Sequence, residues 1–237
     1  LTFNPTPTST FNLPVTGCSG QNVTVTYTGT GTAGAVFNWN FNGATVISGS
    51  GAGPYTISWP SAGTYTVTLD VTQNGCISTV TSNSITINQI PTSTITPPAI
   101  GCAGQNLTIS YGGNASAAAT YTWGWNGGTV MSGSGQGPYS INWATAGTYN
   151  ITLTVTENGC SSSPSSQSVT INPVPTASLT ATTPVCSGTP CNVTYTGNAL
   201  ASSTYNWNFN GATITSGSGQ GPYNVNWPAA GSYNVTV

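Results

Sequence analysis

Apolar and polar residues alternate along several short stretches of the chain, as expected for β-strands with one buried face. Residues 23–27 direct Val and Tyr to one face and Thr to the other, and residues 37–42 alternate Phe and Trp with Asn. Residues 55–59 and 64–71 continue the pattern, with Tyr, Ile, Trp, Val and Leu on the apolar face. These stretches predict strands, and we expect no helix anywhere in the chain.

Turn residues separate the predicted strands. The Asn74-Gly75 dipeptide suits the positive φ of a tight hairpin, and it returns the chain toward a last strand that carries Ile85 and Ile87. About seven short strands with such turns are typical of an antiparallel immunoglobulin-like sandwich. We therefore expect the inward-facing Trp39 in the core rather than on a ligand platform.

The whole pattern recurs every 84 residues without insertion or deletion. A fixed period of this kind indicates tandem structural units. We therefore predict an all-β chain of tandem immunoglobulin-like antiparallel β-sandwiches. The equivalent positions include Trp39, Trp123 and Trp207, Cys18, Cys102 and Cys186, and Gly63, Gly147 and Gly231.

Proline-containing junctions at Pro91 and Pro175 divide the chain into repeats. The phase of the repeat predicts three sandwiches, of which the third lacks its last strand. The predicted segments are 1–5, the last strand of a preceding domain or of a neighbouring subunit's domain, then repeats 6–90, 91–174 and 175–237.

Both ends of the chain are out of phase with the repeat, and two interpretations follow. Either the sequence is a window from a longer repetitive chain, which we favour, or its first strand completes the open third domain of a neighbouring subunit. Both predict head-to-tail continuity, because a sandwich without its last strand exposes an apolar groove. The candidate assembly residues are Leu1, Phe3, Val235 and Val237.

Two motifs resemble the PKD and PKD-like family of immunoglobulin-like domains. Residues 39–43, Trp-Asn-Phe-Asn-Gly, are similar to the family's W-D-F-G-D-G, and residues 63–72 are similar to its G-x-Y-x-V-x-L-x-V-x. Asn or Gly replaces the acidic residues of the first motif, as in the Trp-Gly-Trp-Asn-Gly of residues 123–127. The Cys-x-Gly and Asn-Gly-Cys motifs look like those of giant secreted surface proteins in Bacteroidota. The resemblance implies spacers, stalks or adhesive modules.

The composition excludes several classes of function. The 237 residues include no Lys, Arg or His. Nucleic-acid binding requires basic residues against phosphates, so we expect no nucleic-acid partner. No apolar run reaches the ~20 residues of a membrane span, and no basic cluster is present to attract anionic lipid, so we expect no membrane insertion. The first residues show no leader, and we expect a mature or internal fragment.

Catalytic and metal-binding chemistry has few candidate residues. Asp70 and Glu157 are the two acidic residues, and their repeat equivalents are Thr154 and Gln73, so no carboxylate recurs at one position. Acid–base and nucleophilic catalysis need a His, a Lys or paired carboxylates, and calcium binding needs several carboxylates close together. The glycine-rich residues 48–54 lack the Lys and the helix of a phosphate loop and are interpreted as a connection. We predict a non-enzymatic protein with no metal and no cofactor.

Except for Cys186 and Cys191, the cysteines are far apart, which argues against a zinc cluster. They are typical of disulfides in an oxidising, extracellular compartment, and the alternative is free buried thiols in a cytosolic protein. One hypothesis pairs Cys18 with Cys76 and Cys102 with Cys160, within domains. The other joins Cys18 to Cys160 between domains, and Cys102 to a cysteine beyond Val237. Bonded Cα atoms must lie within about 7 Å of each other, so coordinates decide between the two.

The third repeat departs from this pattern because Cys191 stands where the first has Val23. Cys191 either faces Cys186 across a short loop or fills the core. Glycosylation is a further modification that the sequence allows. Sequons begin at Asn22, Asn106, Asn114, Asn150, Asn192 and Asn234.

The neutral surface favours assembly, because sheet edges that carry no charged residues pack together without like-charge repulsion. We expect a structural segment of an extracellular filament or surface fibre, with copies of itself as partners, head to tail and laterally. The alternative is a stalk or glycan-binding module of a cell-surface adhesin. That alternative needs outward-facing aromatics, whereas nearly all aromatics here occupy inward positions.

Overall fold

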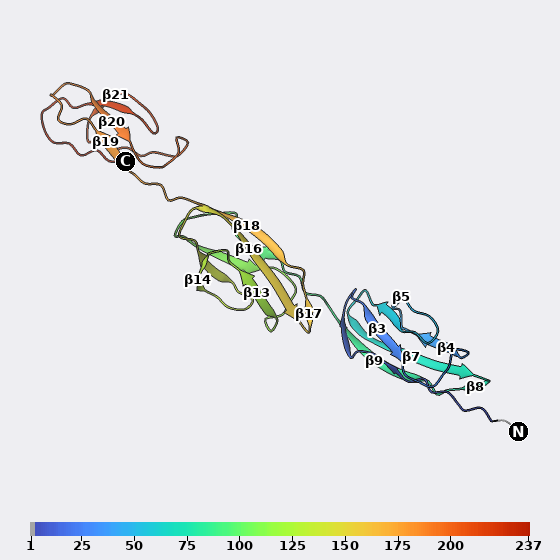
Figure 1. Cartoon of the computed structure of the whole chain (residues 1–237). Helices are drawn as coiled ribbons and strands as arrows, with labels where there is room; N and C mark the ends of the chain where they lie inside the picture. The colour runs from blue at the N-terminus through green and yellow to red at the C-terminus, as the bar shows by residue number, and fades with distance from the viewer. Residues whose placement is uncertain (1–2) are drawn as a thin grey trace. The chain divides into compact units, whose positions relative to one another are not determined.

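A computed structural model describes residues 3–237, so the predicted assembly residue Leu1 lies outside the described part. Strands and connections make up these residues, and none of them is helical; accordingly, no helix suited to crossing a bilayer occurs among them. Figure 1 labels the strands. The chain divides into two compact units, Leu1–Ile171 and Asn172–Val237, which are described separately.

The first sandwich contains two sheets of the immunoglobulin-like kind. One sheet has the order β1-β3-β6-β5, and the other has the order β2-β9-β7-β4, with β8 paired to β7. The strands are β1 (Phe11–Asn12), β2 (Thr16–Cys18), β3 (Val23–Tyr27), β4 (Val36–Asn40), β5 (Thr45–Ser48), β6 (Tyr55–Ser58), β7 (Gly63–Gln73), β8 (Cys76–Ile77) and β9 (Thr81–Asn88).

The second sandwich repeats the same two sheets, with orders β10-β12-β15-β14 and β11-β18-β16-β13, and β17 paired to β16. It completes a chain of tandem all-β immunoglobulin-like domains. The strands are β10 (Ile95–Thr96), β11 (Ile100–Cys102), β12 (Asn106–Tyr111), β13 (Thr120–Gly124), β14 (Thr129–Ser132), β15 (Tyr139–Asn142), β16 (Gly147–Glu157), β17 (Cys160–Ser161) and β18 (Ser165–Asn172).

The period-two pattern produces the core of each sandwich. In β7 the residues Val67, Leu69 and Val71 are fully buried, while Thr68 and Asp70 between them are partly exposed. Ile85 and Ile87 of β9 cover the same core, and Trp59 fills its centre with 1% of its surface exposed. Alternating burial on facing sheets is the reason why these strands stay in one register.

Some strands are not visible in the apolar pattern. The first sandwich has nine strands rather than about seven, because β1 and β8 are two residues long and β5 is exposed at all four positions. In addition, β2 joins β9 in parallel, with Cys18 opposite Asn88, within sheets that are otherwise antiparallel. Short or fully exposed strands carry no alternation, so periodicity does not detect them.

The third repeat forms one complete sheet, with the order β19-β20-β22-β21. Its second layer is represented among the described residues by the bridge between Asn208 and Thr236. In the first two repeats the equivalent long strand pairs with a last strand over seven residue pairs, which holds it extended. The strands are β19 (Leu179–Ala181), β20 (Cys191–Tyr195), β21 (Thr213–Ser216) and β22 (Tyr223–Asn226).

In each repeat, a tyrosine connects the segment that enters the sandwich with the loop after β3, β12 or β20. The Tyr27 hydroxyl donates to the carbonyl of Thr8 at 2.6 Å and accepts from the amide of Gly31 at 2.6 Å. Tyr111 and Tyr195 make the same two contacts in their repeats. The two backbone segments lie so close together here that position 29 has room only for Gly.

We expect Gly29→Ala to lower the free energy of unfolding of the first sandwich by about 1–3 kcal/mol, the usual cost of overpacking. A Cβ at this position would overlap the Thr8 carbonyl oxygen and lie 2.5 Å from the Tyr27 hydroxyl. Gly34→Ala is the matched control, because nothing lies within 4 Å of its Cβ position. Urea unfolding of both variants tests this, and equal midpoints would contradict it.

Candidate functional site

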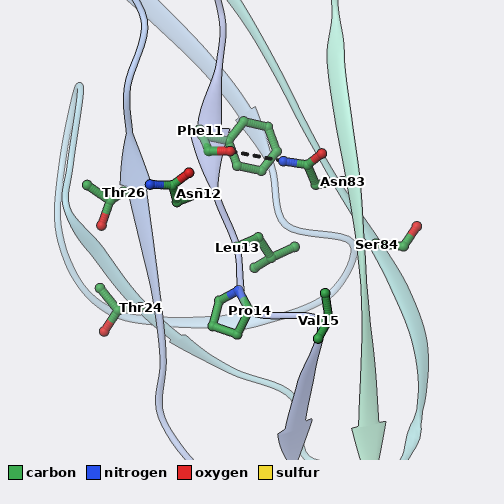
Figure 2. Close-up of a pocket in the computed structure, with 9 residues that line it drawn as sticks. All are labelled: Phe11, Asn12, Leu13, Pro14, Val15, Thr24, Thr26, Asn83 and Ser84. Atoms are coloured by element: carbon green, nitrogen blue, oxygen red, sulfur yellow. Dashed lines mark hydrogen bonds between the residues drawn. The ribbon is translucent and has the colours of Figure 1, made fainter.

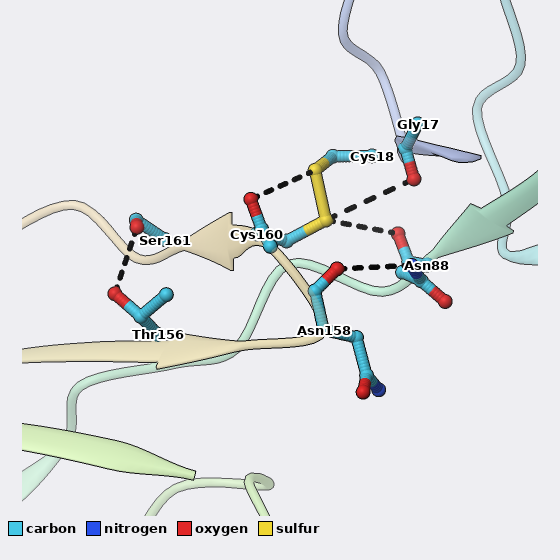
Figure 3. Close-up of a disulfide and its surroundings, with 8 residues drawn as sticks. Gly17, Cys18, Asn88, Thr156, Asn158, Cys160 and Ser161 are labelled. Atoms are coloured by element: carbon cyan, nitrogen blue, oxygen red, sulfur yellow. Dashed lines mark hydrogen bonds between the residues drawn. A yellow bond between two sulfur atoms is a disulfide. The ribbon is translucent and has the colours of Figure 1, made fainter. Parts of the chain in front are cut away.

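A disulfide joins the first sandwich to the second within the Leu1–Ile171 unit (Figure 3). Cys18 ends β2 and bonds Cys160 at the start of β17, with their Cα atoms 5.7 Å apart and a sequence separation of 142. The Asn158-Gly159 turn presents Cys160, with φ values of 50° and 79°. These angles are the left-handed conformation that Asn and Gly adopt readily.

Polar contacts surround the disulfide. The Asn88 side-chain amide donates to the carbonyl of Asn158 at 3.1 Å. The Cys160 sulfur lies 3.8 Å from the carbonyl oxygen of Gly17 and 3.9 Å from that of Asn88. The strand that leaves the first sandwich therefore contacts the hairpin of the second, and Cys160 is only 1% exposed. We call this arrangement the joint, and it comprises Gly17, Cys18, Asn88, Asn158 and Cys160.

The pairing within domains is wrong in this structure, because Cys76 and Cys102 are both free. Cys18 lies beside Asn88, at the end of the sheet where β7 begins, whereas Cys76 pairs with Gln73 where β7 ends. The eleven residues of β7 separate these two ends. At about 3.3 Å per residue the separation is roughly 30 Å, far beyond the reach of a disulfide.

Cys191 is also free, and it is buried in the core of the third repeat at 4% exposure. Its place in the core is explained by the sizes of the side chains at two neighbouring positions. In the second repeat, a Cβ at Gly101 would lie 2.5 Å from Leu107, so a large residue at one position requires a small one at the other. The third repeat exchanges the sizes, with Val185 at the glycine position and Cys191 at the leucine position.

The first sandwich repeats some contacts of the joint on its own hairpin. The Asn4 side-chain amide lies 3.5 Å from the carbonyl of Asn74, and the thiol of Cys76 lies 3.6 Å from the carbonyl of Asn4. These contacts repeat those of Asn88 with Asn158 and Cys160, each 84 residues earlier. Sequence reasoning missed the Asn residues, although Asn4, Asn88 and Asn172 recur at the 84-residue period.

The two carboxylates make local hydrogen bonds in separate repeats. Glu157 accepts hydrogen bonds from the amide and hydroxyl of Ser116, at 3.0 and 2.5 Å, and these bonds lower the pKa of its carboxyl group. Its equivalent Gln73 accepts from the amide of Thr32 at 3.1 Å. Asp70 accepts from the side chain of Asn38 at 2.8 Å. Each acidic side chain therefore has a local structural role.

We expect Glu157→Gln to make the second sandwich less sensitive to acid. Because the folded pKa lies below the usual 4.5, ionised Glu157 stabilises the fold above that pH, and the contribution disappears as the pH falls through the folded pKa. The effect is small, since the group is exposed to solvent. The reciprocal variant Gln73→Glu should give the first sandwich the same acid sensitivity. Melting temperatures at pH 7 and pH 3 test both variants, and an unchanged pH profile contradicts the assignment.

Stacked aromatics clamp the glycine-rich connection of each repeat. Trp39 stacks on Phe41 with ring centroids 5.4 Å apart, and its indole N–H donates to the carbonyl of Gly51 at 3.0 Å. The Tyr55 hydroxyl donates to the same carbonyl at 3.2 Å, and burial raises its pKa. Trp39 packs against the core but is only half-buried. Its polar edge is therefore satisfied within its own domain.

The first sandwich also has an open groove of about 550 Å³ beside β1 and β9 (Figure 2). Asn83 crosses it and donates to the carbonyl of Phe11 at 3.0 Å. Phe11, the aromatic residue of the lining, is 5% exposed, so it offers no ring face for stacking on a sugar. The lining comprises Phe11, Asn12, Leu13, Pro14, Val15, Thr24, Thr26, Asn83 and Ser84.

The remaining predicted site residues are not members of the joint. Five sequon asparagines are exposed and Asn192 is partly exposed. Phe3 is 84% exposed, and Val235 and Val237 are half-buried in the third repeat. Within residues 3–237, no three His, Cys, Asp or Glu side chains come together as metal ligands would.

One domain family model matches part of the chain. Residues 88–171 match the PKD domain. This span contains the second sandwich and its half of the joint. No curated protein sequence matches the chain significantly.

Solved structures match the chain at low sequence identity and low TM-score. The chain is 17% identical to the fibronectin(III)-like modules of Clostridium thermocellum CbhA, covering 69% of this chain and 95% of that one, with a TM-score of 0.32. Invasin, a bacterial integrin-binding protein, is 17% identical over 96% of this chain, with a TM-score of 0.41. The chain spans about half of the invasin structure, 56%. We take no functional argument from these likenesses.

Proposed function

We propose that this chain is a structural segment of an extracellular fibre, in which PKD-like sandwiches follow one another head to tail and disulfides fasten successive repeats. One observation carries the proposal. Cys18 and Cys160 cross-link consecutive repeats at the point where the chain passes from one to the next. A cross-link at that point resists the bending that a flexible connection allows, and bending resistance is a property of a shaft.

The side chains support a structural rather than a catalytic role. Asp70 bonds a neighbouring strand and Glu157 holds a loop, each within its own repeat, and the aromatic clusters use their N–H and O–H groups on the glycine-rich connections. Net charge is −2 over the whole chain, so copies approach each other with little repulsion. We further propose that the segment is part of a giant secreted surface protein of the Bacteroidota type, supported by its Cys-x-Gly and Asn-Gly-Cys motifs.

Electron microscopy of the purified native material tests the proposal. We expect continuous filaments whose reconstruction shows one density unit per 84 residues and a bridge between successive units. Separate, flexible beads or monomers would overturn the fibre and favour the stalk of an adhesin. A glycan array on the same sample distinguishes the glycan-binding alternative, for which the fibre proposal expects no specific signal.

A further inference from the structure

Asn88 contacts both sides of the joint. Its backbone lies beside Cys18 in the parallel pairing of β2 with β9, and its carbonyl accepts from the amide of Ser19 at 2.9 Å. Its side-chain amide reaches the second sandwich and donates to the carbonyl of Asn158 at 3.1 Å (Figure 3). One residue therefore holds both the strand end that carries Cys18 and the turn that presents Cys160.

The hydrogen bond from the Asn88 side chain does not depend on sulfur. In the part of the chain that the structure describes, the other hydrogen-bond contacts between the first and second sandwiches all involve the sulfur of Cys18 or Cys160, at 3.8 to 3.9 Å. Sulfur is a weak hydrogen-bonding atom, and these contacts require that the two cysteines have already met. In the reduced chain, the Asn88 side chain is therefore the polar group that can hold the two sandwiches together.

A contact of the same kind forms where no disulfide is present. The side-chain amide of Asn4 lies 3.5 Å from the carbonyl of Asn74, and Cys76 of the same hairpin is a free thiol. The Asn74-Gly75 turn has φ values of 51° and 78°, against 50° and 79° for the turn that begins at Asn158. The turn and its Asn contact therefore do not require a sulfur bond.

The choice of a partner for Cys18 needs such a contact. The chain has six cysteines, and full pairing of six allows 15 connectivities. Cys102 and Cys186 are exposed thiols and compete for the same bond. Because an intramolecular disulfide forms in proportion to how often its two thiols meet, a contact that holds two domains together raises the effective concentration of one thiol at the other.

We propose that the Asn88 side chain selects Cys160 as the partner of Cys18. It docks the end of the first sandwich on the turn at Asn158 before oxidation, and so places the two thiols side by side. Asn88 is a positioning residue, because its side chain binds the backbone of the hairpin rather than either sulfur. The inference rests on the disulfide-fastened joint of the proposed function and adds how that joint is assembled.

The oxidation itself needs a small-molecule disulfide from outside the protein. The thiols of Cys18 and Cys160 each lose a proton, their sulfurs form one bond, and two electrons pass to the small-molecule disulfide, which is cleaved into two thiols. Oxidised glutathione supplies this step in the laboratory. Asn88 takes no part in the electron transfer and changes only how often the two thiols meet.

Reoxidation of the whole 237-residue chain tests the proposal. The chain is reduced without denaturant, transferred to a glutathione redox buffer, and sampled over time by alkylation and peptide mapping. Asn88→Asp keeps the size of the side chain but cannot donate at neutral pH. We expect it to slow formation of the Cys18–Cys160 bond by about two- to tenfold, the usual weight of one hydrogen bond. More Cys18 should then be found bonded to glutathione or to other cysteines.

Asn4→Asp is the matched control, because Asn4 makes the same kind of contact with the other hairpin. We expect this variant to form the Cys18–Cys160 bond at the native rate and yield. A native rate and yield in Asn88→Asp, or equal slowing in both variants, would overturn the inference. Circular dichroism of the reduced chains shows that the comparison is made between folded proteins.

A second measurement needs no substitution. In the reduced native chain, nuclear Overhauser contacts between the side-chain amide of Asn88 and the turn at Asn158 should persist, and their absence would overturn the inference. The outcomes also separate it from the proposed fibre. A native chain that forms no Cys18–Cys160 bond would overturn both, whereas a bond that forms independently of Asn88 would overturn this inference alone.

Discussion

Trp59→Ala should lower the free energy of unfolding of the first sandwich by about 3–5 kcal/mol, the usual cost of deleting a large buried aromatic side chain. The indole is 1% exposed and stacks on Tyr65 with ring centroids 5.2 Å apart. Its N–H donates to the carbonyls of Phe41 and Asn42, at 3.2 and 3.3 Å. The substitution therefore leaves a cavity and removes the donor that holds the turn after β4.

Trp227→Ala is the matched control for this prediction, because it removes the same side chain from the same repeat position where the core is open. Trp227 is only half-buried beside the groove of the third repeat, so we expect a distinctly smaller loss there. Hydrogen exchange resolved by repeat, together with urea unfolding, separates the two domains. Equal losses in both would contradict the assignment of the effect to the greater burial of Trp59.

Removing the joint should have the second large effect. With a sequence separation of 142 residues, the disulfide between Cys18 and Cys160 restricts the unfolded chain strongly. The loop-entropy relation gives about 5 kcal/mol for the two sandwiches unfolding together. We therefore expect Cys18→Ser/Cys160→Ser to unfold at clearly lower urea concentration, with each sandwich retaining its own fold below the transition.

Cys102→Ser controls for the loss of a cysteine alone. It is the repeat equivalent of Cys18 and forms no bond in the structure, so its unfolding midpoint should equal that of the native chain. Reduction of the native chain with dithiothreitol should reproduce the double variant. A midpoint shared by the reduced and oxidised native chains would contradict the cross-link.

The sequence predicts most of the sandwich because its core strands alternate cleanly. Residues 64–71 lie within β7 and alternate in burial as predicted, and the Asn74-Gly75 turn has the positive φ angles that its residue types favour. The alternation of apolar residues does not predict the exposed β5 or the parallel pairing of β2. Their positions follow from neighbouring strands rather than from any pattern of their own.

The sequence limits the disulfides to two pairing schemes, within domains or between domains, but does not decide between them. The 84-residue period relates Cys18 to Cys102 and Cys76 to Cys160, yet it carries no information on how one sandwich meets the next. The deciding contact is between Asn88 and Asn158, because it brings the exit strand of one repeat to the hairpin of the other. The distance between cysteines of two successive sandwiches depends on such contacts and not on the apolar period within each sandwich.

Peptide mapping of the unreduced native chain tests the central claim most directly. The chain has no Lys or Arg for trypsin, so chymotrypsin, which cleaves after its Tyr, Phe and Trp residues, is the suitable protease. We predict a disulfide-linked pair of peptides that contain Cys18 and Cys160. Recovery of Cys18 bonded to Cys76, with Cys102 bonded to Cys160, would contradict the account, since each sandwich would then be closed on itself and successive repeats would not be fastened.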